Sequence, residues 1–146
     1  MSLANLNTAS AANRGAEMTV LHPVDRVPLK QENGSHVTMT LLGRDSDEFI
    51  SAERRARKAA REAMTKRLPY SPADEDRQAD SALAAATVGW SGIPAGWLEP
   101  GGTDETPASF SPENAIKLYG NPGVRWLRDQ VDEFIGDRAN LLKASR

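Results

Sequence analysis

The stretch that decides the fold is residues 45–67, which read DSDEFISAERRARKAAREAMTKR. It has neither Gly nor Pro and consists largely of Ala, Arg, Lys and Glu, which are good helix formers. Asp45 or Ser46 can cap its first turn, and acidic residues follow at the positive end of the helix dipole. Its apolar residues recur at helical spacing, as Phe49, Ala52, Ala56, Ala59, Ala60, Ala63 and Met64. We therefore expect a long helix with one thin, Ala-rich face.

A second helix is expected after a short interruption. Pro69 ends the first helix, and Ser71 with Pro72 places a capping residue and a proline where helices begin. The helical pattern then continues to Val88. Because the connection is short, residues 45–88 are expected to form an antiparallel helical hairpin.

The chain before this hairpin carries the strand signal. Residues 17–44 are expected to form a short β-hairpin region, because Asn33-Gly34 favours a tight turn between two strands. Residues 37–42 alternate Val, Met and Leu with Thr and Leu, which suits a strand with one buried face. Residues 1–16 are polar and lack periodicity, so we expect a disordered arm there.

The chain after the helical hairpin divides into two parts. Residues 89–110 are rich in Gly and Pro, so we expect an irregular segment whose tryptophans fold back over the helical hairpin. Residues 111–142 are expected to form C-terminal helices, the last of them an amphipathic helix over residues 124–142. Residues 17–142 then make a single domain, mainly α within the α+β class.

Composition excludes several classes of function. The chain of 146 residues contains no Cys, which removes disulfides, thiol nucleophiles, thiolate zinc sites and iron–sulfur clusters. No apolar run approaches the ~20 residues that span a bilayer. The first residues lack the basic and apolar regions of a signal peptide, so we expect a soluble protein of the cytoplasm. The formal net charge of −2 gives no overall attraction to nucleic acid or to membranes.

Motifs of catalysis are not found in the sequence. The two histidines, His22 and His36, have no partner at metal-ligand spacing. Gly89-Trp90-Ser91-Gly92 only imitates a nucleophile elbow, because its spacing differs. The acids from Asp74 to Asp80 are best explained by the first turns of a helix. We therefore expect no catalytic residue, no metal, no cofactor and no enzymatic activity.

Basic residues concentrate on the first long helix. Residues 53–67 contain seven Lys or Arg and two Glu, so this segment carries +5 and the rest of the chain −7. A solvated helix face is the favoured interpretation. An acidic protein partner is the second, and nucleic acid is the least favoured because aromatic residues are not interleaved with the charges.

Two surfaces are candidates for binding a protein partner. One is the Ala-rich face of the first long helix, and the other combines tryptophans with the apolar side of the last helix. Their members are Ala52, Ala56, Ala59, Ala63, Trp90, Trp97, Trp126, Leu127, Val131 and Phe134. For the aromatic residues, a place in the core is the alternative that we favour.

Several segments resemble the tail assembly chaperones of tailed bacteriophages and prophages. The segments are Leu41-Leu42-Gly43-Arg44-Asp45-Ser46, Thr87-Val88-Gly89-Trp90-Ser91-Gly92-Ile93, Phe110-Ser111-Pro112-Glu113-Asn114-Ala115, Leu118-Tyr119, residues 126–135 and residues 137–141. The resemblance covers most of residues 17–142. It consists of a pattern of ordered segments and includes no catalytic signature.

The resemblance implies partners. It implies that the chain binds the tape-measure protein and tail-tube subunits in the cytoplasm of a bacterial host and is absent from the mature virion. The uneven charge along the chain also suggests head-to-tail self-association that weakens with salt. A structural tail or head–tail connector subunit is the alternative, and a nucleic-acid-binding regulator that uses residues 53–67 is a further one.

Overall fold

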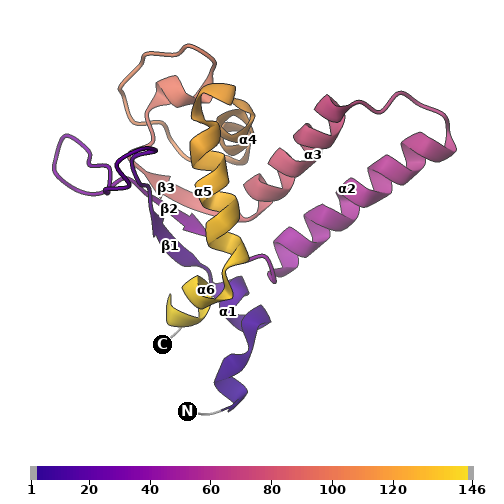
Figure 1. Cartoon of the computed structure of the whole chain (residues 1–146), viewed down its shortest axis with the longest axis horizontal. Coiled ribbons are helices and arrows are strands. Elements are labelled where there is room, and N and C mark those ends of the chain that lie inside the picture. Colours follow the sequence, from indigo (N-terminus) through magenta and orange to yellow (C-terminus); the bar gives the residue numbers. More distant parts are fainter. Residues whose placement is uncertain (1–2, 145–146) are drawn as a thin grey trace.

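A small antiparallel sheet forms the centre of the molecule, and helices pack around it (Figure 1). The structure is a computed structural model and describes residues 3–144. Within that range the sheet has three strands in the order β1-β2-β3, with bounds Ala16–Thr19, Thr38–Leu41 and Thr87–Ser91. The expected mainly α fold of the α+β class is confirmed.

One face of the sheet belongs to the core. Met18 pairs with Met39 in the register of β1 and β2, and both side chains are buried together with that of Leu41. They join buried side chains of α3, α4 and α5 in one cluster. Between β2 and β3 the register shifts, which leaves Val88 exposed on the edge strand.

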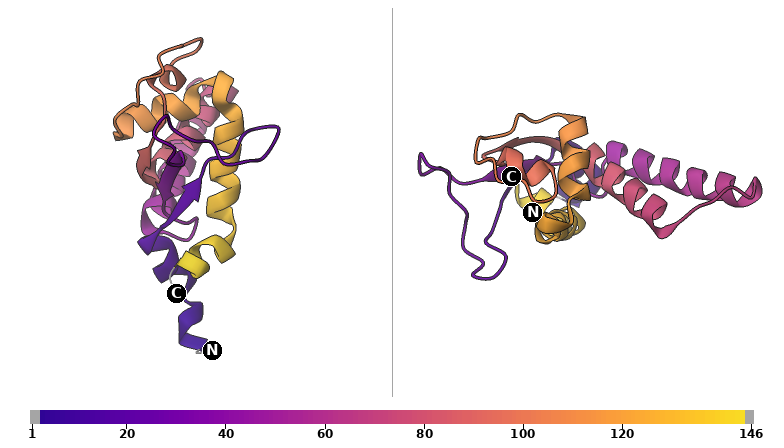
Figure 2. Two further views of the ribbon diagram at one scale, coloured as in Figure 1. Left: turned by 90° about the vertical axis from the view of Figure 1, so that its left-hand side faces the viewer. Right: turned by 90° about the horizontal axis from the view of Figure 1, so that it is seen from above.

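Two long helices form an arm that projects from the rest of the molecule (Figure 2). Their bounds are Asp47–Thr65 for α2 and Pro72–Ala85 for α3. The Ser46 side chain caps α2 by accepting from the Phe49 N–H, and Ser71 caps α3 in the same way. The expected antiparallel helical hairpin is present, because caps, proline and spacing act within a few residues. Its second helix ends at Ala85 and not at Val88, because Thr87 and Val88 join strand β3 beside β2. We call α2, α3 and their connection the arm, and the remainder the body.

The C-terminal part contains several short helices. They are the 3-10 helix η2 (Ala95–Leu98), α4 (Pro112–Gly120), the 3-10 helix η3 (Pro122–Val124), α5 (Arg125–Gly136) and α6 (Arg138–Ala144). The expectation of one helix over residues 124–142 is wrong, because the chain breaks at Asp137. Gly136 weakens the end of α5, and the Asp137 carboxylate accepts from the Ala139 N–H and so begins a new helix.

The N-terminal segment is ordered, which corrects the expected disordered arm. It forms the 3-10 helix η1 (Leu3–Leu6) and helix α1 (Thr8–Arg14), and residues 1–2 lie outside the described range. Ala11 and Ala16 are buried against Leu141 of α6 in a second small core. Helix α1 takes much of its packing from α6 at the other end of the chain, so local sequence does not reveal this helix.

The expected hairpin at Asn33-Gly34 is present, but it does not join β1 to β2. Lys30 and His36 form an antiparallel bridge across this turn, and the Val37 N–H donates to the Leu29 carbonyl at 2.9 Å. The paired segments belong to an excursion over residues 20–37 that lies between β1 and β2. Gly34 has a φ of 87°, and its N–H donates to the Gln31 carbonyl at 2.9 Å. Pro28 takes part only in an isolated bridge with Leu21, since it has no N–H to donate to a continuous ladder.

The segment over residues 89–110 is partly a strand and does not cover the helical hairpin. Its first residues belong to β3, and the rest packs beside α4 and α5 (Figure 1). Trp90 lies edge-on against Phe110 with ring centroids 5.1 Å apart, and Trp97 lies edge-on against Trp126 at 5.4 Å. These aromatic pairs fix the segment to the body.

Candidate functional site

A groove lies where the two helices of the arm meet α5. Its volume is about 490 Å³, and it is lined by residues of α2, α3 and α5 and of the neighbouring loops. The lining residues are Arg44, Phe49, Glu53, Ala56, Arg57, Ala60, Tyr70, Glu75, Gln78, Ala79, Ala82, Leu83, Arg128 and Asp132. We call this the arm groove.

Small side chains make the walls of the arm groove. Ala56 and Ala60 lie one turn apart on α2, and Ala79 and Leu83 lie one turn apart on α3. Alanine fills little of the space between two helices, so a hollow remains between them. The sequence therefore encodes the groove directly, through alanines at helical spacing on two facing helices.

Ion pairs close the end of the groove nearest the body. The Arg128 Nε lies 2.7 Å from the Asp80 Oδ1, and both side chains are largely buried. The Arg44 Nη2 lies 2.7 Å from the Asp132 Oδ1, and its guanidinium stands 5.3 Å from the centre of the Phe49 ring. Because these contacts join α3 and the start of α2 to α5, they hold the arm against the body.

The rim of the groove is charged and polar. Glu53 and Arg57 stand on the α2 side, Glu75 and Gln78 on the α3 side, and Tyr70 at the connection. Such a site can take apolar side chains of another helix and can pair with charged residues beside them. Apart from the Tyr70 phenol and the Gln78 amide, the polar side chains of the lining are all charged.

Titratable groups elsewhere have structural partners. The Nδ1 atom of His22 accepts from the N–H groups of Val24 and Asp25, so this ring caps a local turn. Burial raises the pKa of Tyr119, whose hydroxyl lies 2.6 Å from the Thr87 Oγ1 and ties α4 to β3. Among residues 3–144, no group of three or more His, Asp or Glu could hold a metal ion.

The Ala-rich face of α2 is divided between the core and the groove. Ala56 lines the groove, as expected of a partner-binding residue. Ala52 and Ala63 are buried, and Ala59 is half-buried outside the groove lining. The alanines that the sequence presents as one face of the helix therefore divide into two groups, because α3 covers some of them and leaves others to line the groove.

The second set of candidate residues, the tryptophans and the apolar side of the last helix, does not form an exposed surface. Leu127 and Val131 are fully buried in the core beneath α5, which corrects their assignment to a partner-binding face. Phe134 is half-buried beside β1, away from the groove. Trp90, Trp97 and Trp126 are half-buried against the core, also away from the groove. The favoured alternative for the aromatic residues, a place in the core, describes these tryptophans better.

Basic side chains cover the outside of α2. Arg54, Arg55, Arg57, Lys58 and Arg61 are exposed, and Lys58 forms an ion pair with Glu62 at 3.9 Å. The solvated face favoured from the sequence agrees with this exposure. The unpaired charges also remain available to an acidic partner.

Sequence reasoning missed the residues that close the groove. Arg44, Tyr70 and Arg128 come from a loop, a connection and a helix that are far apart in the sequence. Only the spacing of Gln78, Ala79 and Leu83 on the second helix gave a signal that could have been used. The pairing of Arg128 with Asp80 depends on how two distant helices meet, which no local pattern reveals.

Comparison of the chain with models of protein families, with curated proteins and with solved structures finds no match. Over residues 3–144, no helix is both long enough and apolar enough to cross a membrane. The arrangement of the groove is therefore the main physical guide to function.

Proposed function

We propose that this protein is a non-catalytic tail assembly chaperone that binds a helical segment of another polypeptide in the arm groove. The observation that carries the proposal is the groove itself, with alanine walls and a charged rim at the foot of a projecting arm. The resemblance to phage tail assembly chaperones supplies the clients, which are the tape-measure protein and the tail-tube subunit. In this proposal the protein acts in the bacterial cytoplasm and is absent from the finished virion.

The walls suit a client whose contacts vary along its length. Alanines impose little shape of their own, so Leu, Met or Phe side chains of a client helix can enter the hollow between α2 and α3. The charges of Glu53, Arg57 and Glu75 then lie beside the entering helix and can pair with its polar flanks. Such a groove accepts many related segments, as an extended helical client requires.

The expected binding is reversible. Burying one Leu or Phe side chain contributes about 1.5–3 kcal/mol, so three anchors give roughly 5–9 kcal/mol before the costs of association. Those costs are about 4 kcal/mol or more, which leaves weak binding at each single site. Several copies along one client can together keep it soluble, and each copy can still leave when the tail tube forms.

A matched pair of variants tests the proposal. Ala60→Phe places a ring in the groove, whereas Ala59→Phe places the same ring on the neighbouring residue, which is not part of the lining. Each variant is co-expressed with a tape-measure protein of a tailed phage, and the soluble client is measured. We expect wild type and Ala59→Phe to keep the client soluble and Ala60→Phe to fail. Equal activity of both variants, or an insoluble client with wild type, refutes the proposal.

The alternative functions give different results in simple assays. A structural tail or head–tail connector subunit would be found in purified virions by mass spectrometry, whereas a chaperone would be missing. A nucleic-acid-binding regulator would shift DNA or RNA in a gel at physiological salt, and Arg54→Glu/Arg55→Glu would abolish the shift. The observation that favours this last alternative is that the arginines of α2 are exposed and could contact phosphate groups.

A further inference from the structure

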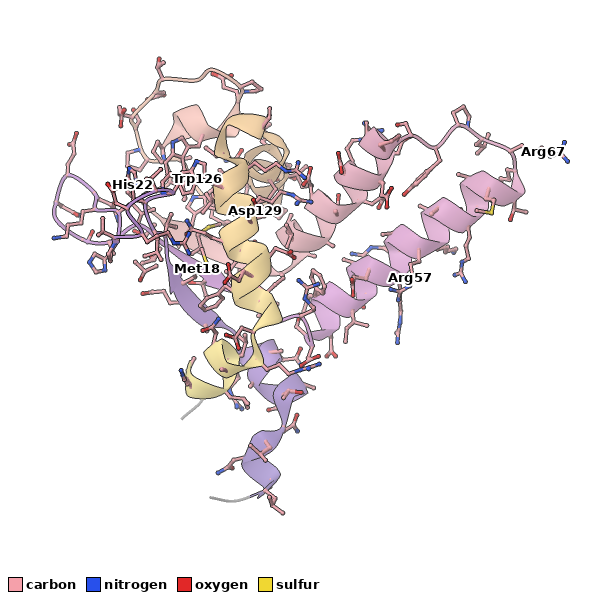
Figure 3. All side chains as sticks on the ribbon, viewed as in Figure 1. Met18, His22, Arg57, Arg67, Trp126 and Asp129 are labelled. Carbon is pink, nitrogen blue, oxygen red and sulfur yellow. The ribbon has the colours of Figure 1, made fainter. Side chains whose placement is uncertain are left out.

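The far end of the arm combines exposed apolar and basic side chains. Met64 and Leu68 are 82% and 56% exposed, and Tyr70 follows them at 37%. Lys66 and Arg67 lie between these residues and are exposed as well (Figure 3 labels Arg67 at this end). We call residues 64–70 the tip. Large apolar side chains rarely gather at the end of a projecting element unless another surface covers them.

A cleft of matching character lies on the body, between β1 and α5. Its volume is about 210 Å³, and its apolar lining comes from Met18, Leu21 and Phe134. Glu133 and Asp137 of the α5 end contribute acidic groups. Thr19, Arg26, Gln130 and Asn140 complete the lining, with Arg26 as its one cation. We call this the sheet cleft.

The charges of the tip, and those of Glu133 in the cleft and Asp129 one turn before it on α5, have no ion-pair partners among the described residues. Within residues 3–144, neither Lys66 nor Arg67 lies within 4.0 Å of a carboxylate, and the same holds for Asp129 and Glu133 toward basic groups. Asp129 and Glu133 are one turn apart on the exposed side of α5, next to the cleft. The protein thus presents an unpaired basic tip and an unpaired acidic cleft.

We infer that the tip of one copy docks in the sheet cleft of a second copy of this chain. Met64 and Leu68 would enter the apolar part of the cleft, while Lys66 and Arg67 would meet the acids of α5. The occupant is a second copy because both halves of the match, apolar and charged, are present on this chain. Apart from Tyr70, which also lines the arm groove, the residues of the tip lie outside that groove, and this self-association does not depend on the proposed function.

The geometry sets the form of the assembly. Arg67 lies at one extreme of the molecule and Met18 on the opposite side of α5, as the labels in Figure 3 show. A contact between two different surfaces is heterologous, so each added copy leaves one tip and one cleft free. The copies would therefore form a ring or an open chain rather than stop at a symmetric dimer.

The first test is sedimentation velocity of the full chain over a range of concentration and salt. We expect association that grows with concentration and weakens about ten-fold or more between ~0.1 M and ~1 M NaCl, because the screening length falls from ~10 Å to ~3 Å. Met64→Ser/Leu68→Ser, which alters only exposed side chains, should weaken association at both salt concentrations. A wild-type protein that remains monomeric up to about 1 mM overturns the inference.

The second test exchanges the charges. One variant, Lys66→Glu/Arg67→Glu, has an acidic tip and keeps the acids of α5. The other, Asp129→Lys/Glu133→Lys, keeps the basic tip and has two basic side chains on α5, Lys at position 133 in the cleft and at position 129 beside it. Neither should associate alone, because like charges meet. An equimolar mixture should associate again, since each tip then faces a cleft of opposite charge. A mixture that stays monomeric, or single variants that associate like wild type, contradicts the inference.

A control keeps charge and helix constant but changes position. Arg54→Glu/Arg55→Glu makes the same charge reversal near the middle of α2, away from the tip, and it should associate as wild type does. A basic and apolar tip could instead meet an anionic membrane surface. If wild type binds phosphatidylserine vesicles through Lys66 and Arg67 while the exchanged pair fails to associate, the tip belongs to that surface and the inference of a second copy is wrong.

Discussion

The Arg128–Asp80 ion pair allows a quantitative test of how the arm is held to the body. Its two side chains are only 13% and 10% exposed, and their Nε and Oδ1 atoms are 2.7 Å apart. Asp80→Ala would leave the Arg128 guanidinium largely buried without its carboxylate. Breaking a buried pair in this way typically costs about 3–5 kcal/mol. Because both side chains keep some contact with water, we expect the loss in unfolding free energy to lie at the low end, about 3 kcal/mol. For a chain of this length that lowers Tm by about 10 °C.

The molecule provides its own control for this prediction. Arg44 and Asp132 are also 2.7 Å apart, but their side chains are 43% and 54% exposed. Water and salt screen this second pair, so Asp132→Ala should cost less than about 1 kcal/mol. The comparison therefore varies burial at constant distance.

The assay is urea unfolding followed by circular dichroism, with Asp80→Ala, Arg128→Ala and the double variant measured together. The losses in unfolding free energy of the two single variants, added together, should exceed the loss of the double variant by about 2 kcal/mol or more, because the two residues act as one unit. Adding ~1 M NaCl should change the Asp132→Ala result more than the Asp80→Ala result. A loss below about 0.5 kcal/mol for Asp80→Ala, or strict additivity, refutes the view that this pair fastens the arm.

Three further perturbations have expected outcomes. Gln130→Ala removes the side-chain amide that donates to the Leu21 carbonyl at 2.8 Å and accepts from its N–H at 3.0 Å, so it should cost about 1–3 kcal/mol and speed hydrogen exchange at Leu21. The hydrogen bond from Arg138 lowers the pKa of Asp45 below 3.8, so Asp45→Asn should reduce stability above that pH, and the difference should vanish as pH falls through the lowered pKa in urea titrations. Gly43→Ala would place a Cβ within 3 Å of buried atoms in α1 and α6, so it should lower stability by about 1–3 kcal/mol in the same assay.

Each of these has an outcome that would contradict it. Unchanged exchange at Leu21 in Gln130→Ala would mean that the excursion is held by other contacts. A pH-independent difference for Asp45→Asn would remove the carboxylate charge from the explanation. A neutral Gly43→Ala would show that α1 does not pack closely beside this residue.

Local signals in the sequence located the elements whose causes are local. Ser46, Ser71 and Ser111 each cap a helix, as their positions before acids or proline indicate. The antiparallel arm follows from those caps and from the short connection between them. Capping and helix spacing act over three or four residues, so a single sequence contains all the information that they need.

Elements that depend on distant partners were missed for the opposite reason. Helix α1 is held by Leu141, and strand β3 exists because β2 offers it a ladder despite Gly89. The burial of Leu127 and Val131 likewise depends on the sheet beneath α5. An amphipathic pattern shows that one side of a helix is apolar, but it cannot show whether the cover for that side comes from the same chain.

The candidate site was only half visible in the sequence. The alanines of α2 were identified, and Ala56 does line the groove, but Arg128 and Asp132 reach it from a helix far along the chain. Charge asymmetry was also evident from residue counts, whereas the projecting tip that concentrates it was not. Shape, unlike composition, emerges only when the elements are assembled.

The packing of α1 against α6 has a consequence for how the protein is made. Ribosomes release a chain from its first residues onward, so Ala11 and Ala16 emerge long before Leu141 is synthesised to cover them. Until Leu141 is synthesised, this patch stays exposed to water and α1 lacks its contacts with α6. The sheet and the arm can form earlier, and the contact between α1 and α6 follows once Leu141 has been synthesised.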